Sequence, residues 1–366
     1  MIDKKTVVIL CNVSNVLDFR RDLIRELTHK YHVTIVCEDE RYIPSYREMG
    51  CNYIHSRSSQ HGTNPFMELV TIVDYIRILR AIKPELVITY TIKPNIYGGM
   101  ACALLHLPYI TNITGLSDAI VSGGAMSRLL LLMYRLALRK TDTIVFQNTS
   151  SAELFERRRI SRGNSIVVSG SGVNLDEHPY EQYPENSGEL TLLTLGRIMK
   201  AKGIDELLEA AEIIRKQYPF VHFKLLGTIH ENYETKIAQA VSVGTVEYCG
   251  HTEDVRPFLK DSHATIHASY HEGMSNALLE TASTGRPIIA TNIPGCRETF
   301  DEGITGIGFK PKDSNDLVRA IEQFIAIPYK KKKRMGLAGR KKMEREFDRR
   351  DVTSKHLAII ERAIGS

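Results

Sequence analysis

Two glutamates stand eight positions apart in the stretch HEGMSNALLE (271–280). Between them, Gly273 lets the backbone turn or approach a ligand closely. Ser275 or Asn276 is a good N-cap for a following helix. Backbone N–H groups at such a helix start bind anions and hydroxyls. The pattern therefore indicates a polar ligand held by two acids, whereas the purely structural alternative is a helix with an acid before it and a solvent-exposed glutamate.

A second stretch, TLGRIMKAKGIDELLEA (194–210), carries two cations, Arg197 and Lys202, on the loop between a strand and a helix. Arginine offers a planar fork of donors and lysine a point charge, a combination suited to a diphosphate. A diphosphate leaving group would be stabilised there as its charge develops. A solvated basic loop is the structural alternative for this stretch taken alone.

Three histidines recur every fourth residue at His263, His267 and His271, as zinc ligands do on a helix. The stretch around His267, ATIHAS (264–269), has the alternation and β-branched residues of a strand, where that spacing does not bring the three rings together. The acidic stretch CEDE (37–40) reads as a solvated turn. We therefore expect no metal site.

The elements that position these residues can be predicted from the sequence pattern. Apolar β-rich runs alternate with amphipathic helical patterns, which is typical of parallel sheets covered by helices. A chain of 366 residues favours two domains. The fold class predicted is α/β, with two doubly wound domains facing each other across a cleft. The predicted strands lie at 6–10, 33–37, 85–90, 108–114, 143–148, 190–196, 221–227, 245–250, 264–269 and 287–292.

Gly, Ser, Pro, Asn and acidic residues interrupt this rhythm at 165–189, which we interpret as the interdomain linker. The expected N-terminal domain covers 1–170, the hinge 171–189 and the C-terminal domain 190–349. A terminal helix at about 350–366 is expected to complete the N-terminal domain.

Composition is that of an ordinary soluble protein, 43% hydrophobic and 25% charged, with a modest net charge of +5. Six scattered cysteines without a Cys-x-x-Cys pair favour reduced thiols in a cytosolic protein. No apolar run is long enough to span a bilayer. The leucine-rich, basic stretch AMSRLLLLMYRLALRK (125–140) is compatible with either an interfacial helix on an anionic membrane or a packed helix with a basic rim.

The two chemical motifs together resemble the donor domain of retaining glycosyltransferases of family GT4, which have the GT-B fold. The similarity consists of G-R-x-x-x-x-K-G at 196–203 and a Glu-x7-Glu motif formed by Glu272 and Glu280. The resemblance implies that Arg197 and Lys202 bind the donor diphosphate.

The resemblance extends over nearly the whole chain. GSGVNLDEH (170–178) is similar to the family's interdomain hinge, and GRPIIATNIPGCRE (285–298) to the strand and loop after the Glu-x7-Glu motif. YTIKPNIYGGMAC (90–102) with TNITGL (111–116) further resembles bacterial members that build capsule, O-antigen or related surface glycans.

By resemblance, the catalytic residues are Arg197, Lys202 and Glu272, with Glu272 holding the transferred sugar and Glu280 the ribose. The residues implied in donor binding are Gly196, Gly227, His251, Thr252, Gly273, Met274, Ser275, Asn276 and Glu280. The implied chemistry is a front-face substitution that retains the anomeric configuration and needs no metal, no cofactor and no protein nucleophile.

The acceptor side departs from the family pattern, because Thr114-Gly115 stands where many members have His-Gly. That role passes to Asn112 or Thr114 or is vacant. The candidate acceptor-binding residues are Asn15, Lys93, Asn95, Asn112 and Thr114.

The function implied is transfer of a hexosyl or N-acetylhexosaminyl group from a UDP-sugar to a polyprenyl-diphosphate-linked saccharide. The enzyme would lie in the cytoplasm, peripheral to the inner face of the anionic membrane, with no nucleic-acid partner. Two alternatives remain open. One is a UDP-sugar epimerase of the GT-B fold, which would need acid and base residues around the sugar. The other is a non-catalytic nucleotide-sugar-binding module.

Overall fold

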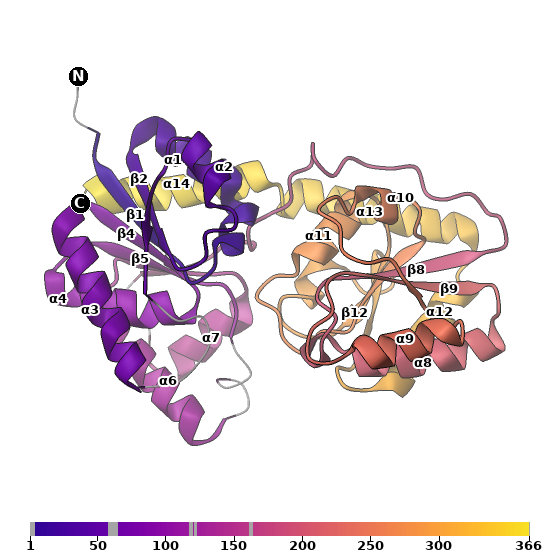
Figure 1. Ribbon diagram of the computed structural model, residues 1–366. Helices are drawn as coiled ribbons and strands as arrows, with labels where there is room; N and C mark the ends of the chain where they lie inside the picture. The colour runs from indigo at the N-terminus through magenta and orange to yellow at the C-terminus, as the bar shows by residue number, and fades with distance from the viewer. Residues whose placement is uncertain (1–3, 58–64, 117–119, 121–122, 161–163, 366) are drawn as a thin grey trace. The chain divides into compact units, whose positions relative to one another are not determined.

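The computed structural model forms two compact units (Figure 1). The first comprises Met1–Ser171 with Arg349–Ser366, and the second Gly172–Asp348. Each unit has its own parallel sheet and is described by itself. The residues that the structure describes are 4–57, 65–116, 120, 123–160 and 164–365.

Seven parallel strands form the sheet of the first unit, in the order β3-β2-β1-β4-β5-β6-β7. Along β1, Val7 and Ile9 face one helical layer while Val8 and Leu10 face the other, as the two-residue period of a strand requires. The strands are β1 (Thr6–Leu10), β2 (His32–Cys37), β3 (Asn52–His55), β4 (Leu86–Tyr90), β5 (Tyr109–Ile113), β6 (Thr143–Phe146) and β7 (Asn164–Val167).

Helices cover both faces of this sheet (Figure 1). One face carries α1 (Arg21–Lys30), α2 (Ile43–Glu48) and α14 (Arg349–Gly365). The other face carries α3 (Pro65–Ile82), α4 (Gly99–Leu105), α6 (Gly124–Ala137) and α7 (Thr149–Arg157). A 3-10 helix spans Ser14–Arg20 and a π-helix Pro94–Gly98.

The C-terminal helix α14 is part of the first unit's core. Val352, Ile359 and Ile360 are buried in the same cluster as Leu23 and Ile24 of α1. An ion pair of 2.6 Å between Lys30 Nζ and Glu361 Oε1 also joins α1 to α14. Residues from the two ends of the chain therefore build one hydrophobic layer.

Six parallel strands form the sheet of the second unit, in the order β10-β9-β8-β11-β12-β13. Along β8, Leu190 and Leu192 face one layer of helices, and Leu193 and Leu195 face the other. The strands are β8 (Leu190–Leu195), β9 (Val221–Leu226), β10 (Glu247–Tyr248), β11 (Ala264–His267), β12 (Ile288–Thr291) and β13 (Gly306–Phe309).

Two helical layers also enclose the second sheet. Side chains of α8, α9 and α12 share one buried cluster, and those of α11 and α13 another. The helices are α8 (Ile204–Gln217), α9 (Glu234–Ser242), α10 (Arg256–Lys260), α11 (Asn276–Ser283), α12 (Ser314–Ala326) and α13 (Tyr329–Glu346). Short 3-10 helices span Lys200–Lys202 and Arg297–Thr299.

The α/β architecture predicted from the alternating pattern is confirmed, but the pattern missed β3, β7 and β13. Strand β7 is exposed along its whole length and so has no apolar face to detect. The linker interpretation is therefore wrong for residues 165–167, which belong to this strand. Strand β13 contains two glycines, which are rare in strands. Gly306 is needed there because a Cβ would lie 2.7 Å from the backbone oxygen of Ile288.

Five of the six cysteines are buried, Cys249 is partly exposed, and all six are free thiols. Among the described residues, no helix combines the length and the apolar character needed to cross a bilayer.

Candidate active site

The strand order of the second unit creates a switch point between β8 and β11. From β8 the chain proceeds outward through β9 and β10, and it then returns to place β11 on the opposite side of β8. In doubly wound sheets, ligands bind at such a point, at the carboxyl ends of the strands. The loop with both cations follows β8, and the loop with Glu272 follows β11. The backbone N–H of Tyr270 donates to the oxygen of Ala201 at 3.0 Å, which ties the two loops together.

Glycines let these loops approach each other. Gly203 has a φ of 67°, and a Cβ there would lie 2.2 Å from the backbone oxygen of Ala268. Gly227, with a φ of 149°, would place a Cβ 1.8 Å from the oxygen of Gly196. Any side chain at either position would push the loops apart, so both glycines are required by the packing.

Lys202 and Glu272 form an ion pair across the switch point, with 2.5 Å between Nζ and Oε1. The side chains are 21% and 14% exposed. The residues are 70 positions apart in the sequence, yet the pairing of β11 with β8 brings their loops together. Two of the three residues implied in catalysis are therefore direct partners.

His267 completes this cluster from the end of β11. Its Nε2 lies 2.9 Å from the same Glu272 oxygen, Oε1. Burial opposes ionisation of Glu272, but the hydrogen bond from His267 and the charge of Lys202 outweigh it, so the pKa of Glu272 lies well below its ordinary value. The second oxygen, Oε2, makes no hydrogen bond within the described part of the chain, and it can accept a ligand hydroxyl.

The elbow after Glu272 differs from the expected row of ligand-facing amides. The backbone N–H of Ser275 donates to the oxygen of Gly295 at 2.9 Å, so this amide is already used. The Ser275 hydroxyl lies 3.2 Å from His267 Nε2 and does not cap α11, although Ser275 holds the N-cap position. The assignment of Ser275 as a donor ligand is therefore corrected: it holds the elbow in place against the Gly295 loop.

Arg197 lies on the same loop as Lys202 but is exposed, and within the described residues it has no hydrogen bond or ion pair. His251 is likewise exposed, on the loop after β10. Thr252 exchanges hydrogen bonds with Asp254, whose N–H donates to the Thr252 hydroxyl at 3.1 Å. Gly227 donates its N–H to the oxygen of Gly250, which joins the loops after β9 and β10.

Glu280, the second acid of the pair, lies inside α11. Its side chain is only 15% exposed, and His178 Nε2 lies 4.0 Å from its Oε1. The loop bearing His178 is fixed to the end of α11, because the Ser283 hydroxyl donates to the His178 oxygen at 2.6 Å. The solvent-exposed interpretation of Glu280 is therefore wrong.

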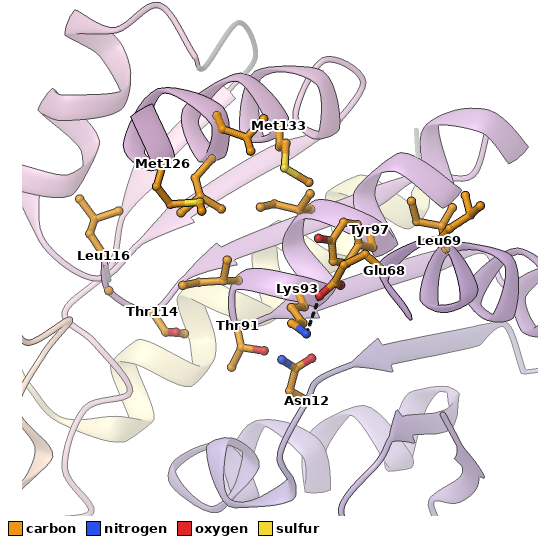
Figure 2. Close-up of a pocket in the computed structure, with 16 residues that line it drawn as sticks. Asn12, Glu68, Leu69, Thr91, Lys93, Tyr97, Thr114, Leu116, Met126 and Met133 are labelled. Carbon is orange, nitrogen blue, oxygen red and sulfur yellow. Dashed lines mark ion pairs between the residues drawn. The ribbon is translucent and has the colours of Figure 1, made fainter. Parts of the chain in front are cut away.

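The first unit contains a cavity of about 860 Å³ at the carboxyl ends of β1, β4 and β5. Figure 2 shows Thr91 and Lys93 near Asn12, and Met126 and Met133 of α6 on the opposite side. The lining residues are Asn12, Glu68, Leu69, Ile72, Thr91, Ile92, Lys93, Ile96, Tyr97, Thr114, Gly115, Leu116, Met126, Leu129, Leu130 and Met133.

Lys93 lies in this cavity and forms an ion pair with Glu68 of α3, with 2.8 Å between Nζ and Oε1 (Figure 2). Thr114 also lines the cavity, as does Asn12. The Asn12 Oδ1 atom is buried and has no hydrogen-bond partner within the described residues. Polar contacts for a ligand are thus concentrated at one end of the cavity.

Two of the expected acceptor ligands belong to the core instead. The Asn95 side chain accepts from the Thr89 hydroxyl at 2.7 Å and donates to the Asn112 oxygen at 2.8 Å. The Asn112 side chain donates to the Thr89 oxygen at 3.3 Å. Both are buried and satisfied by β4 and β5, so their assignment to acceptor binding is corrected. The side chain of Asn15 lies outside the part of the molecule that the structure describes.

Comparison with protein families matches both units to glycosyltransferases. Residues 178–342 match the model described as "Glycosyl transferases group 1", and residues 6–148 match "Glycosyl transferase 4-like". Together the two models match most of the chain, which belongs to the glycosyltransferases.

Curated relatives of this glycosyltransferase match along most of its length. One, from Campylobacter jejuni, is N,N'-diacetylbacillosaminyl-diphospho-undecaprenol alpha-1,3-N-acetylgalactosaminyltransferase, 22% identical over 369 residues, with 96% of each chain covered. Another is the Staphylococcus aureus capsular polysaccharide biosynthesis glycosyltransferase CapM, 24% identical, with 92% of each chain covered.

Solved structures with the same fold include a glycosyltransferase from Rickettsia africae, with a TM-score of 0.79, 18% identity and 99% of each chain covered. Anabaena Alr3699/HepE, solved with UDP and glucose, gives a TM-score of 0.78 at 14% identity and covers 97% of this chain and 99% of its own. The GT-B fold of this glycosyltransferase is thereby established.

Sequence reasoning missed two members of these sites. The spacing of the histidines presents His267 only as a metal-ligand candidate, although its place at the end of β11 puts it next to Glu272. Glu68 carries no local signal, because an acid in the first turn of a helix is common. Its partner Lys93 is 25 residues away, and only the fold brings the two together.

Proposed function

We propose that this glycosyltransferase moves a sugar from a UDP-linked donor to a polyprenyl-diphosphate-linked saccharide in bacterial surface-glycan synthesis, with retention of configuration. The observation that carries the donor half of this proposal is the Lys202–Glu272 pair at the β8/β11 switch point. In this pair, the Lys202 ammonium suits the diphosphate of the donor and the Glu272 carboxylate suits its sugar.

Lys202 supplies the cation for the diphosphate. Its ammonium has three N–H donors, of which one is directed at Glu272, so donors remain for phosphate oxygens. The exposed Arg197 on the same loop adds a planar fork. These cations stabilise the charge that develops on the departing diphosphate, which is the role that we propose for them in place of a metal ion.

Glu272 supplies the acceptor of hydrogen bonds for the sugar. Its lowered pKa keeps it ionised at neutral pH, and Oε2 is oriented by the two contacts that hold Oε1. A hydroxyl of the transferred sugar would donate to Oε2. Glu280, largely shielded from solvent on α11, is proposed to bind the ribose.

The proposed reaction needs no covalent intermediate with the protein. The acceptor hydroxyl oxygen forms a bond to the anomeric carbon as the bond from that carbon to the diphosphate oxygen breaks. The hydroxyl proton passes to the departing diphosphate. Attack from the face that the diphosphate leaves gives a product of the same anomeric configuration as the donor.

The acceptor is inferred from a relative and from the first unit. The C. jejuni relative is named for a diphospho-undecaprenol-linked acceptor. In this chain, α6 exposes Met126, Leu129, Leu132 and Leu136 beside the exposed Arg128, a combination suited to an anionic membrane surface. We propose a peripheral position on the cytoplasmic face, with Lys93 near the acceptor phosphates.

Donor screening tests this proposal directly. Purified protein is incubated with individual nucleotide sugars and a lipid-diphosphate-saccharide acceptor, and the masses of the products are measured by mass spectrometry. We expect one UDP-sugar to add a single residue to the acceptor. Glu272→Gln should abolish this transfer, and Lys200→Ala, at an exposed lysine of the same loop, should not. Epimerised UDP-sugar without glycosylated product would support the epimerase alternative.

A further inference from the structure

The cavity of the first unit has two chemically different ends. Its apolar wall is built by Leu69 and Ile72 of α3 and by Leu129, Leu130 and Met133 of α6. Its polar edge carries Asn12, Thr91, Lys93 and Thr114, as Figure 2 shows. At about 860 Å³ it lies near the upper end of the roughly 300–1,000 Å³ typical of small-molecule pockets. These features match an amphiphile with a long apolar part.

The apolar wall continues onto the surface. Leu69 and Leu129 line the cavity and are nevertheless exposed, and further exposed apolar side chains follow them along both helices. These further side chains are Met67, Val70 and Val73 of α3 and Leu132 and Leu136 of α6. Contiguous apolar surface beside a pocket marks a ligand or membrane contact. A chain that enters the cavity would cover Leu69 and Leu129 at the mouth, whereas the apolar side chains beyond the lining would stay uncovered.

The polar edge fits a head group that bears both hydroxyls and negative charge. The buried, unpartnered Asn12 Oδ1 requires a donor such as a sugar hydroxyl. Lys93 provides a cation at the same edge, held by Glu68. Arg128 on α6 and Arg139 just after its end are exposed and add positive charge near the apolar face. This charge pattern favours an anionic amphiphile over a neutral one.

We propose that this cavity binds the isoprenoid chain of the acceptor, with its diphosphate-sugar head at the polar edge near Asn12 and Lys93. The inference rests on the proposed function and extends it: the enzyme recognises the lipid itself, not only the saccharide. Binding should then tighten with chain length while the chain stays inside the cavity, by about tenfold or more for each isoprene unit that is enclosed.

The absence of tryptophan from the chain makes this inference testable by fluorescence. Leu129 lines the cavity and Leu132 does not, yet they lie on the same helix and are 50% and 51% exposed. Leu129→Trp and Leu132→Trp therefore give matched single-tryptophan reporters. Each is titrated in solution, without membranes, with farnesyl diphosphate below its micelle concentration, with inorganic diphosphate and with palmitate.

We expect a saturable blue shift with farnesyl diphosphate in the Leu129→Trp variant only, and none with inorganic diphosphate. A silent reporter at position 129, or the same shift at both positions, would overturn the inference. Equal binding of palmitate would also overturn it, because the cavity would then hold lipid chains without preference for isoprenoids.

A kinetic experiment separates this inference from the proposed function. Against a farnesyl-diphosphate-linked saccharide, Leu129→Ser should raise KM about tenfold with kcat within twofold, and Leu132→Ser should change neither in solution. With a methyl-diphosphate-linked saccharide, both variants should match the wild type. Farnesyl diphosphate binding by the Leu129→Trp variant, without transfer to any acceptor by the wild type, would refute the proposed function alone. Transfer without a change in KM for Leu129→Ser would refute the cavity assignment alone.

Discussion

Replacing Lys202 by alanine should lower both turnover and stability, because its Nζ atom pairs with Glu272 and is proposed to bind the diphosphate. In Lys202→Ala, Glu272, whose side chain is 14% exposed in the wild type, keeps His267 on Oε1 but loses the cation at 2.5 Å. Loss of one charge-stabilising donor typically lowers turnover roughly 100- to 1,000-fold. Breaking a buried ion pair costs about 3–5 kcal/mol. Because His267 remains and Lys202 is partly exposed, we expect a loss of about 2 kcal/mol in unfolding free energy.

The double variant Lys202→Ala/Glu272→Gln distinguishes the two effects. The second change removes the charge left without its partner, so it should restore at least half of the lost unfolding free energy. Turnover should fall further, because Glu272 is proposed to hold the sugar. Stability is measured by urea unfolding and turnover by product formation, with Lys200→Ala as the control. Wild-type turnover in Lys202→Ala, or a double variant less stable than the single one, would refute the reasoning.

Three further predictions concern the product, the pH dependence and the membrane. NMR of the product should show the α anomer from an α-linked UDP-sugar, with turnover unchanged by EDTA; a β linkage would exclude the retaining mechanism. Burial beside Lys332 and Arg286 lowers the pKa of His263 to about 4. The free energy of unfolding should therefore fall as pH drops from about 6.5 towards 4, by at most about 3 kcal/mol, and it should fall less in His263→Gln. Equal losses for the two proteins in urea unfolding would contradict this. The wild type should float with anionic liposomes, and a variant with Arg128, Arg135 and Arg139 changed to Glu should not. Equal flotation of the two would refute membrane binding through α6.

The sign of the His263 effect follows from its hydrogen bond. The backbone N–H of Thr191 donates to His263 Nδ1 at 3.0 Å, which requires an unprotonated Nδ1 in the folded protein. The unfolded chain binds a proton near pH 6.5, whereas the folded chain resists it until about pH 4. Stability is therefore complete above the unfolded value and is lost between the two.

A structural feature of this protein can be predicted from the sequence when neighbouring residues carry its signal. Central strands such as β1 and β8 are apolar on both faces, and such runs are recognisable without a structure. The edge strand β7 is exposed throughout and gives no comparable signal. The two motifs meet in the structure because each lies at the end of a strand, and strand ends of a parallel sheet meet at one edge.

Direct partners within the sites could not be predicted in this way. Nothing near Lys202 in the sequence indicates that its partner is Glu272, because the contact depends on the pairing of β11 with β8. Asn95 and Asn112 look like ligands in the sequence, but a buried amide satisfied by neighbouring strands has the same residue type as one that faces a pocket. Burial separates the two cases, and burial is a property of the fold.

The inclusion of α14 in the first unit has a consequence for biosynthesis. Leu23 and Ile24 of α1 leave the ribosome early, but Val352 and Ile360, which share their core, are translated only after the whole second unit. The unit that is begun first is thus finished last, and the part of its apolar sheet face that α14 covers stays exposed during most of translation. Such a face is a binding surface for chaperones and a risk for aggregation. Truncation before Arg349 should accordingly impair the first unit, although the residues removed lie at the opposite end of the sequence.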